Sequence, residues 1–171
     1  KIESDINGDD YIDAKDCYVV PGFIDTHMHG AVGCHFLDCP PDTHKKVGKI
    51  ELENGTTSLC PALSAAVHEK MIMAAKKMVE AIKNLIENSS RYVGIHYEGP
   101  FFNVKYKGAH KPENIRNATI QEFDKLYDAA EGYLKIITMA PEIDGGFEVV
   151  KHATKKGVEV SIGHSAATFS D

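Results

Sequence analysis

The sequence predicts an α/β fold, specifically an incomplete (β/α)8 barrel of the TIM type with about its first five strands present. Apolar stretches of strand length alternate with stretches whose apolar residues recur at helical spacing, which is typical of parallel sheets. Residues with metal-binding chemistry stand at or just beyond the carboxyl ends of the expected strands. Those ends surround one site in a barrel and line one crevice in a doubly wound sheet.

The amino-terminal part predicts turns and short strands before the first helix. Residues 1–17 are polar and contain Asn7-Gly8, a hairpin-turn signal. Residues 18–29, YVVPGFIDTHMH, predict a strand, a Pro-Gly turn and a second strand. Residues 42–55 have the pattern of an amphipathic helix that ends at a glycine.

The next strand and helix are predicted by composition and periodicity. Residues 56–63, TTSLCPAL, are rich in β-forming residues, and residues 67–87 have one apolar face at helical spacing. That face comprises Met71, Ala74, Ala75, Met78, Ile82, Leu85 and Ile86. We expect its methionines to pack in the core rather than to form a cofactor surface.

The alternation continues to the end of the sequence. Residues 91–100 predict a strand, 119–131 a shorter helix and 134–142 a strand. A helix with terminal glycines is expected over 145–157, and a last strand over 158–165.

Composition and charge exclude several classes of partner. The net charge of −6, from 19 basic and 25 acidic residues, predicts no general attraction to nucleic acid or to an anionic membrane. No apolar run approaches the roughly 18 to 20 residues of a membrane span, and residues 1–20 do not resemble a signal peptide. These traits predict a cytoplasmic protein.

The cysteines show no metal-binding or redox spacing. Cys17, Cys34, Cys39 and Cys60 form no CxxC pair, and in a chain with cytosolic traits we expect reduced thiols rather than disulfides. A structural zinc site that uses Cys34 and Cys39 is the alternative.

The segment FIDTHMHGAVG, residues 23–33, contains two histidines one residue apart. In an extended strand, residues i and i+2 point to the same face, so His27 and His29 project side by side while Met28 turns away. Two neutral imidazoles on one face are able to share a metal ion. The same pair is also compatible with a strand end that binds no ligand. Residues elsewhere in the chain decide whether the pair is part of a metal site.

Glu98 and His164 supply further ligand chemistry from two other expected strands. Three imidazoles and one carboxylate suit Zn²⁺, Fe²⁺, Mn²⁺ or Co²⁺. A bridging carboxylate at Glu98 would lie between an ion on His27 and His29 and a second ion on His164. Asp25 shares the strand face of His27 and is the alternative ligand; otherwise it orients an imidazole by a hydrogen bond.

Four segments carry a specific resemblance. PGFIDTHMHG, then HYEGPFFN followed by KYKGAHKPENIR, then MAPE and IGHSAAT occur in this order. Together they resemble the N-acetylglucosamine-6-phosphate deacetylase family of the amidohydrolase superfamily, over residues 18–171. H-x-EGPF followed by KGAH is the most specific part, because it separates this family from dihydroorotases and hydantoinases, which usually bridge their metals with a carboxylated lysine.

The resemblance implies the metal ligands. Glu98 matches the family's metal-binding glutamate, and His164 matches the first of its two later histidine ligands. His27 and His29 match a pair found in members that hold two metals; other members replace this pair and hold one. We therefore expect one or two divalent ions, with Zn or Fe favoured over other metals.

The resemblance also implies a role for the loop after Glu98. Ala109 and His110 match a segment that contacts the sugar, although spacing alone would make His110 a surface-loop histidine. His96 shares the strand face of Glu98, and we expect it behind the ligands. The basic side chains of the loop either attract a phosphate or form a solvated surface: Lys105, Lys107, Lys111 and Arg116. No role in the chemistry is expected of His35, His44, His68 and His152.

The activity implied by the resemblance is the metal-dependent hydrolysis of N-acetylglucosamine 6-phosphate to glucosamine 6-phosphate and acetate. The partner is then a small phosphorylated amino sugar, and the complete enzyme is expected to be a homo-oligomer, dimeric or tetrameric. Two alternatives stay open: another amidohydrolase activity, such as a cyclic amidase or deaminase, and a non-catalytic fragment that binds a metal or a sugar phosphate.

The sequence departs from the family at its end. The family's second later histidine and its catalytic aspartate have no match here and are expected beyond residue 171, so no catalytic residue is assigned within this chain. Residues 1–20 are expected to be a remnant of the family's small β domain, and residues 21–171 the amino-terminal part of the barrel. We therefore expect an inactive fragment of the enzyme.

Overall fold

The strands follow one another around the sheet in chain order. A computed structural model describes residues 12–84 and 87–170. Its parallel sheet runs β1 (Phe23–Met28), β2 (Thr56–Ser64), β4 (Ile95–Glu98), β5 (Leu134–Met139) and β6 (Glu159–Ile162), and the short β3 (Arg91–Tyr92) pairs with β2 beside this path. A doubly wound sheet reverses its order at a switch point. The unreversed order therefore confirms the incomplete barrel.

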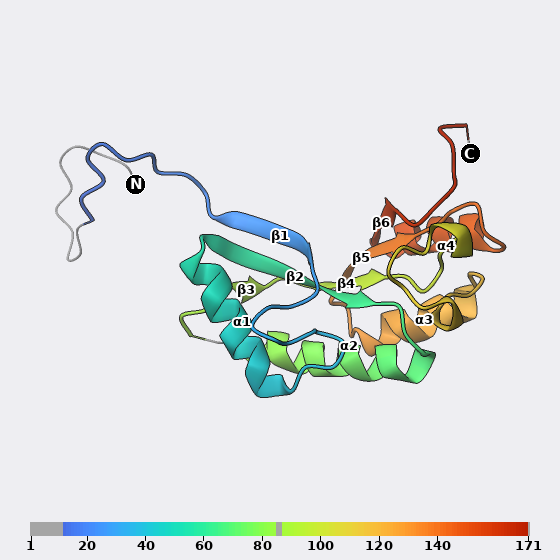
Figure 1. Ribbon diagram of the computed structural model, residues 1–171, viewed down its shortest axis with the longest axis horizontal. Coiled ribbons are helices and arrows are strands. Elements are labelled where there is room, and N and C mark those ends of the chain that lie inside the picture. The colour runs from blue at the N-terminus through green and yellow to red at the C-terminus, as the bar shows by residue number, and fades with distance from the viewer. Residues whose placement is uncertain (1–11, 85–86, 171) are drawn as a thin grey trace.

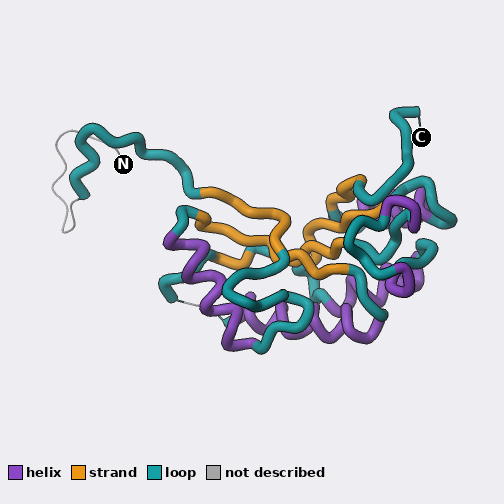
Figure 2. Tube along the Cα trace, viewed as in Figure 1, coloured by secondary structure: helices purple, strands orange, loops and turns teal. Residues whose placement is uncertain are grey.

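The helices cover one side of the curved sheet. They are α1 (Pro41–Glu53), α2 (His68–Lys83), α3 (Ile120–Ala129) and α4 (Gly146–Lys155). Figures 1 and 2 show them along the outer side of the sheet, and each helix contacts the next one in the chain. This is the outer ring of a (β/α) barrel, and the inner face of the sheet is left for other chemistry.

Alternation along the strands separates the core from that inner face. Leu59 and Leu63 of β2 belong to the core cluster packed against the helices, as does Tyr97 of β4. Glu98, which neighbours Tyr97 in β4, points to the opposite face, because successive side chains of a strand alternate. Glu98 lies beside Ser64 of β2 in the strand register. Polar side chains therefore gather on the inner face.

The helices begin and end where the sequence predicts to within a few residues. Met71 and Met78 of α2 are fully buried in the core, as expected for packing residues. Thr119 caps α3, because its side chain accepts the backbone N–H of Glu122, as threonine does at the N-cap position. The expected core positions Leu85 and Ile86 lie outside the described residues, and so does the expected Asn7-Gly8 turn.

Two strand predictions are wrong in detail. Residues 18–22 form no strand; they extend from the sheet as exposed chain (Figure 1). The single strand expected over 91–100 is divided into β3 and β4. The backbone N–H of Val93 donates to Leu59 in β2, whereas that of Ile95 donates to Tyr133, just before β5. The pairing with β2 is interrupted between these two residues, after which β4 pairs with β2 on one side and with β5 on the other.

No helix within the described ranges is long and apolar enough to cross a membrane.

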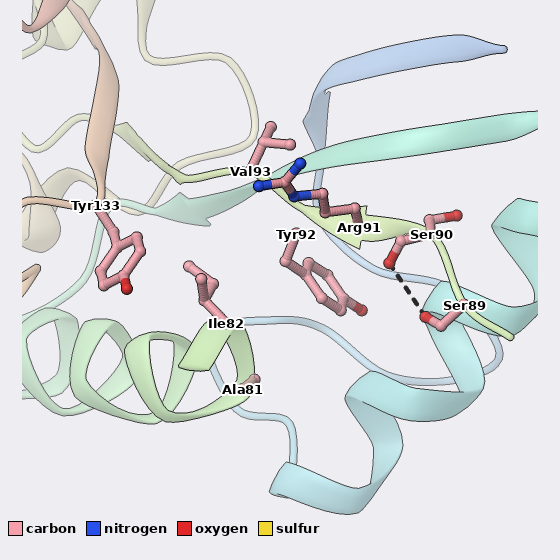
Figure 3. A pocket seen from close by; sticks show the side chains of 8 residues that line it. All are labelled: Ala81, Ile82, Ser89, Ser90, Arg91, Tyr92, Val93 and Tyr133. Carbon is pink, nitrogen blue, oxygen red and sulfur yellow. Dashed lines mark hydrogen bonds between the residues drawn. The ribbon is translucent and has the colours of Figure 1, made fainter. Parts of the chain in front are cut away.

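One hollow, of about 400 Å³, lies at the amino end of the strands, between the end of α2 and the starts of β3 and β5 (Figure 3). Its lining is Ala81, Ile82, Ser89, Ser90, Arg91, Tyr92, Val93 and Tyr133. Active sites of (β/α) barrels lie at the carboxyl end of the strands, so this hollow is not the candidate site.

Candidate metal centre

The carboxyl end of the sheet brings five ligand-type side chains together. Glu98 is the last residue of β4, and His27 lies in β1. His29 directly follows β1, His164 follows β6, and His110 lies in the long loop between β4 and α3. Parallel strands place these ends at one edge of the sheet, which is why residues so far apart in sequence converge.

All four imidazoles face the Glu98 carboxylate through the same ring nitrogen. Oε1 of Glu98 lies 3.3 Å from Nε2 of His27 and 3.3 Å from Nε2 of His164. Oε2 lies 3.2 Å from Nε2 of His29 and 3.1 Å from Nε2 of His110. Two groups of potential ligands result, His27–His29–Glu98 and Glu98–His110–His164, each with its ligand atoms within 4.8 Å of one another.

Hydrogen bonds on the far side of two rings orient them towards Glu98. Nδ1 of His164 is 2.9 Å from the carbonyl oxygen of Tyr106. A carbonyl oxygen only accepts, so this Nδ1 carries the proton, and Nε2 of His164 presents a lone pair towards Glu98 unless the ring is doubly protonated. Nδ1 of His29 lies 3.2 Å from the carbonyl oxygen of Ala62 and 3.0 Å from the hydroxyl of Ser64, which both donates and accepts.

This arrangement fits a divalent cation. A neutral imidazole with its lone pair aimed at a carboxylate oxygen is electrostatically unfavourable, and the cluster is relieved by protons or by metal ions between the groups. Nitrogen from imidazole and oxygen from carboxylate suit Zn²⁺ and Fe²⁺, and the partners behind the rings orient them as metal-bound histidines require.

The charges of the cluster are set by these contacts. Burial raises the pKa of Glu98, but the hydrogen bond with His29 and the positive charges of His110 and His29 outweigh it, so the pKa falls to about 2. The hydrogen bond with Glu98 raises the pKa of His29, whereas burial lowers the pKa of His110. The carboxylate is ionised at neutral pH, and His29 takes up a proton more readily than His110.

His96 lies directly behind the cluster, as its strand face predicts. It is 2% exposed. Its Nδ1 donates to the carbonyl of Thr26 in β1 at 2.7 Å, and its Nε2 accepts from the hydroxyl of Thr138 in β5 at 2.7 Å. Its ring meets that of His27 edge-on, with centroids 4.8 Å apart. Burial lowers the pKa of His96, and this neutral ring ties β1, β4 and β5 together.

A hollow of about 790 Å³ opens over the cluster. Glu98, His29, His110 and His164 line it together with Ala109. Ala109 and His110 were expected on the sugar-contacting segment, and both border this hollow. The loop that carries them contains two short 3-10 turns, Val104–Tyr106 and Pro112–Asn114.

The structure also places the alternative ligand and the basic residues of the loop after β4. Asp25 is not among the potential ligands of the described residues; its carboxylate instead accepts the backbone N–H of His27 at 2.9 Å. Arg116 is held in place, because its guanidinium donates to Glu122 at 2.7 Å and to the carbonyl of Ala66 at 2.9 Å. Lys111 lines the hollow, whereas Lys105 and Lys107 are not among its lining residues.

His35 lies beside the cluster, a position that the sequence did not predict. Its ring stacks on that of His29 with centroids 5.4 Å apart, and it lines the hollow; that it takes no part in the chemistry stays a prediction. The only signal was its position in the loop directly after the His-x-His pair. The other histidines are remote from the cluster: His44 stacks on Phe36, His68 pairs with Glu122 and His152 pairs with Asp124.

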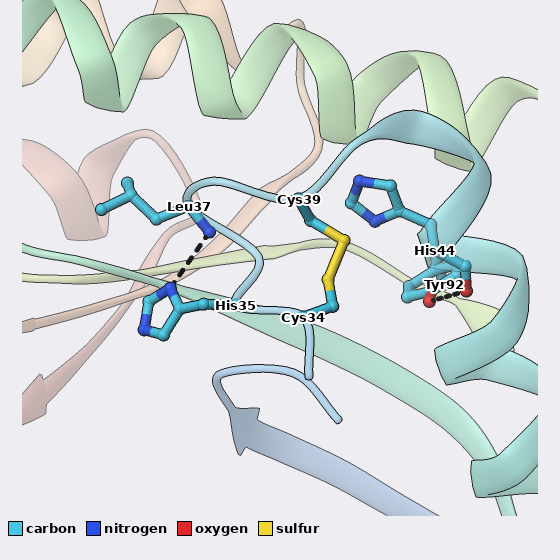
Figure 4. Close-up of a disulfide and its surroundings, with 6 residues drawn as sticks. All are labelled: Cys34, His35, Leu37, Cys39, His44 and Tyr92. Carbon is cyan, nitrogen blue, oxygen red and sulfur yellow. Dashed lines mark hydrogen bonds between the residues drawn. A yellow bond between two sulfur atoms is a disulfide. The ribbon is translucent and has the colours of Figure 1, made fainter. Parts of the chain in front are cut away.

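The expectation of reduced thiols is wrong for one pair. Cys34 and Cys39 form a disulfide across the loop that carries His35, with their Cα atoms 5.4 Å apart (Figure 4). The loop turns back on itself, as the hydrogen bond from the backbone N–H of Asp38 to the carbonyl of His35 shows, and brings the pair within disulfide distance. Cys17 and Cys60 are free thiols, as expected.

Comparisons with known proteins place these residues in a family. The sequence profile of the amidohydrolase family matches residues 18–168. The chain belongs to the amidohydrolase family. All five residues of the cluster, and the loop between β1 and α1, lie within the matched range.

Individual relatives of this amidohydrolase are sugar-phosphate deacetylases. The chain is 32% identical over 149 residues to N-acetylgalactosamine-6-phosphate deacetylase of Escherichia coli O157:H7, covering 87% of this chain and 39% of that protein. It is 33% identical over 154 residues to N-acetylglucosamine-6-phosphate deacetylase of Bacillus subtilis (strain 168), covering 89% and 39%.

A solved relative has the same fold. A variant of N-acetyl-D-glucosamine-6-phosphate deacetylase from Mycobacterium smegmatis, in complex with N-acetyl-D-glucosamine-6-phosphate, superimposes with a TM-score of 0.82 at 30% identity. The match covers 88% of this chain and 38% of that one. This amidohydrolase chain therefore spans about two fifths of the length of the relatives it matches.

Proposed function

We propose that the complete protein hydrolyses the acetamido group of N-acetylglucosamine 6-phosphate, releasing acetate and glucosamine 6-phosphate. The observation that carries the proposal is the convergence of four histidine Nε2 atoms on the Glu98 carboxylate at the carboxyl end of the strands. The relatives named above support the substrate class, since each is named as a deacetylase of a phosphorylated N-acetyl amino sugar.

We propose two ion sites. We assign Glu98 and His164 to a principal divalent ion, Zn²⁺ or Fe²⁺, and His27 and His29 to a second, weaker site beside the same carboxylate. Two groups of ligand atoms within 4.8 Å support two sites, His27–His29–Glu98 and Glu98–His110–His164; of the second group we assign His110 to the substrate. A divalent cation bound there supplies a Lewis acid for the amide carbonyl and lowers the pKa of water so that hydroxide is available near neutral pH.

The chain's own residues prepare the site for this reaction. Glu98, ionised at neutral pH, contributes the negative charge that holds a cation. The carbonyl of Tyr106 keeps the proton of His164 on Nδ1, so its Nε2 is free to bind, and the carbonyl of Ala62 and the hydroxyl of Ser64 orient the ring of His29. His110 and Ala109 border the hollow, and we assign them to contacts with the sugar and its acetamido group.

The group that manages the proton is proposed to lie in the complete protein outside these residues. Among the described residues, Glu98 is the one carboxylate in the ligand groups, and its role there is to bind the ion. An aspartate from a later strand end, as the family resemblance implies, would take the proton from water and deliver it to the leaving amine.

A second candidate substrate is N-acetylgalactosamine 6-phosphate, because the Escherichia coli O157:H7 relative is named for it. The two sugars differ only in configuration at C4. Acetate release by the complete protein loaded with Zn²⁺ or Fe²⁺ is measured with both sugars and with a cyclic amide. Faster turnover of the glucosamine derivative is expected. Turnover of the cyclic amide alone would replace the proposal by another amidohydrolase activity, and metal binding without any turnover would leave a binding protein.

A further inference from the structure

Glu142 joins three strand ends beside the metal centre. It follows β5 in the segment MAPE, for which sequence analysis gave no role. Its Oε1 accepts from the backbone N–H of Ala166 at 2.6 Å and from Nδ2 of Asn103 at 3.0 Å. Its Oε2 accepts from the hydroxyl of Ser165 at 2.6 Å. Asn103 belongs to the loop after β4, and Ser165 and Ala166 to the segment after β6.

These contacts enclose His164. Ser165 and Ala166, both held by Glu142, directly follow it in sequence. The carbonyl of His164 accepts the backbone N–H of Asn103 at 3.0 Å, and Asn103 also donates its side-chain amide to Glu142. The backbone of His164 is thus part of a closed ring of contacts that runs through Asn103, Glu142 and Ser165. The imidazole takes no part in this ring and faces Glu98.

The backbone of His164 needs such support. Its φ is +52°, in the left-handed region that costs free energy for any residue with a β-carbon. A residue stays in that conformation only when the surrounding structure holds it there. Because this φ determines where the side chain leaves the backbone, it also determines whether Nε2 reaches Glu98, 3.3 Å away.

We propose that Glu142 is a positioning residue of the metal centre: it holds the His164 segment in the conformation that directs the imidazole to the principal ion. This inference rests on the proposed metal site, but not on the identity of the substrate. Burial would raise the pKa of Glu142, but the hydrogen bonds from Ser165, Ala166 and Asn103 bring it to about 2. The Glu142 carboxylate is therefore negatively charged at pH values near neutrality.

The test compares variants of the complete protein. In Glu142→Ala, all three hydrogen bonds are lost, and we expect metal affinity, measured by competition with a chromophoric chelator, to fall about 10- to 100-fold, the usual loss when a group that orients a ligand is removed. Glu142→Gln should retain most of the affinity. Its amide oxygen still accepts from Ala166 and Asn103, and its NH₂ group donates to the Ser165 hydroxyl, which is also an acceptor.

The matched control is Asp144→Ala. Asp144 lies two residues away and accepts from Asn117 at 3.1 Å, without contacting the ring around His164. Its loss should leave metal affinity unchanged. Affinity of Glu142→Ala equal to wild type, or an equal loss in both alanine variants, would overturn the proposal.

A variant with a shorter acidic side chain distinguishes the effect of the position of the carboxylate from the effect of its charge. Glu142→Asp keeps the charge but is one methylene shorter, so it cannot span the same three donors. We expect the Glu142→Asp variant to bind metal more weakly than the Glu142→Gln variant; the reverse order would show that only the charge of residue 142 matters and would overturn the positioning role. This comparison stands even if Glu142→Ala does not fold. Since chelator competition reads metal affinity directly, failure of the complete protein to hydrolyse either sugar phosphate would remove the proposed function without deciding this inference.

Discussion

At the scale of single residues, the centre depends on one carboxylate surrounded by four imidazoles. Glu98 is 7% exposed, and its two oxygens are each shared by two histidines. A buried charge is tolerated only when it is paired or binds a metal. The residue is therefore poorly suited to any role that leaves it without cations around it.

Substitutions at three positions distinguish the proposed metal ligands from the proposed substrate contact. Glu98→Gln in the complete protein should remove most bound metal and activity, because a neutral amide is a poor metal ligand compared with a carboxylate. His27→Asn should lose less metal and less activity, since it affects only the second ion.

His110→Ala should impair turnover while the metal stays bound. Metal content is measured by atomic absorption on dialysed protein, alongside kcat/KM.

Each outcome of this series has a distinct meaning. Wild-type metal content in Glu98→Gln would contradict the assignment of the ligand. Complete loss of both ions in His27→Asn would show that the two sites are ranked in the wrong order. Metal loss in His110→Ala would make His110 a ligand, a role that its 3.1 Å approach to Glu98 permits.

At the scale of elements, the end of β4 must turn within one residue of the ligand. Gly99 follows Glu98 with φ of +90°. A β-carbon there would lie 2.8 Å from the Phe102 ring and 3.0 Å from Cβ of Ala65. The turn therefore packs tightly against the loop after β2, and any larger residue displaces the strand end that carries Glu98.

Gly99→Ala tests this turn. It should lower the free energy of unfolding by about 1–2 kcal/mol for the left-handed backbone and by about another 1–3 kcal/mol for the overpacking, and it should also weaken metal binding. Gly132→Ala is the matched control: its φ is +84° but no atom lies within 4 Å of the added β-carbon, so only the backbone cost applies. Urea unfolding of both variants measures the difference, and equal losses would contradict the packing argument.

Elements also explain what the sequence could and could not predict. Alternation along β4 placed Glu98 and His96 on one face, and the His-x-His pair at the end of β1 placed His27 and His29 together, because these patterns depend only on local strand geometry. The approach of His110 depends on the path of a long loop with two 3-10 turns. His35 likewise owes its place to a loop that a disulfide closes, and no local periodicity specifies such paths.

At the scale of the whole molecule, the sheet formed by the described residues is open at its two edges. β1 and β6 are the outer strands, and large apolar side chains on them are solvent-exposed, with Phe23 at 70%, Ile24 at 66% and Ile162 at 67%. Within the described residues, no strand covers either edge. Exposed strand edges pair with other chains, and in a closed barrel they do not exist.

The 171 residues alone should therefore not catalyse deacetylation. A missing general acid or base typically costs about 10²- to 10⁴-fold in rate, and the open edges should drive aggregation or pairing between copies. Purified residues 1–171 are assayed for acetate release from N-acetylglucosamine 6-phosphate with added Zn²⁺, Fe²⁺ or Mn²⁺, with light scattering to record the assembly state and the complete protein as reference. Release near the reference rate would contradict the prediction, because the proton-transfer group would then have to come from within these residues or from a second copy of them.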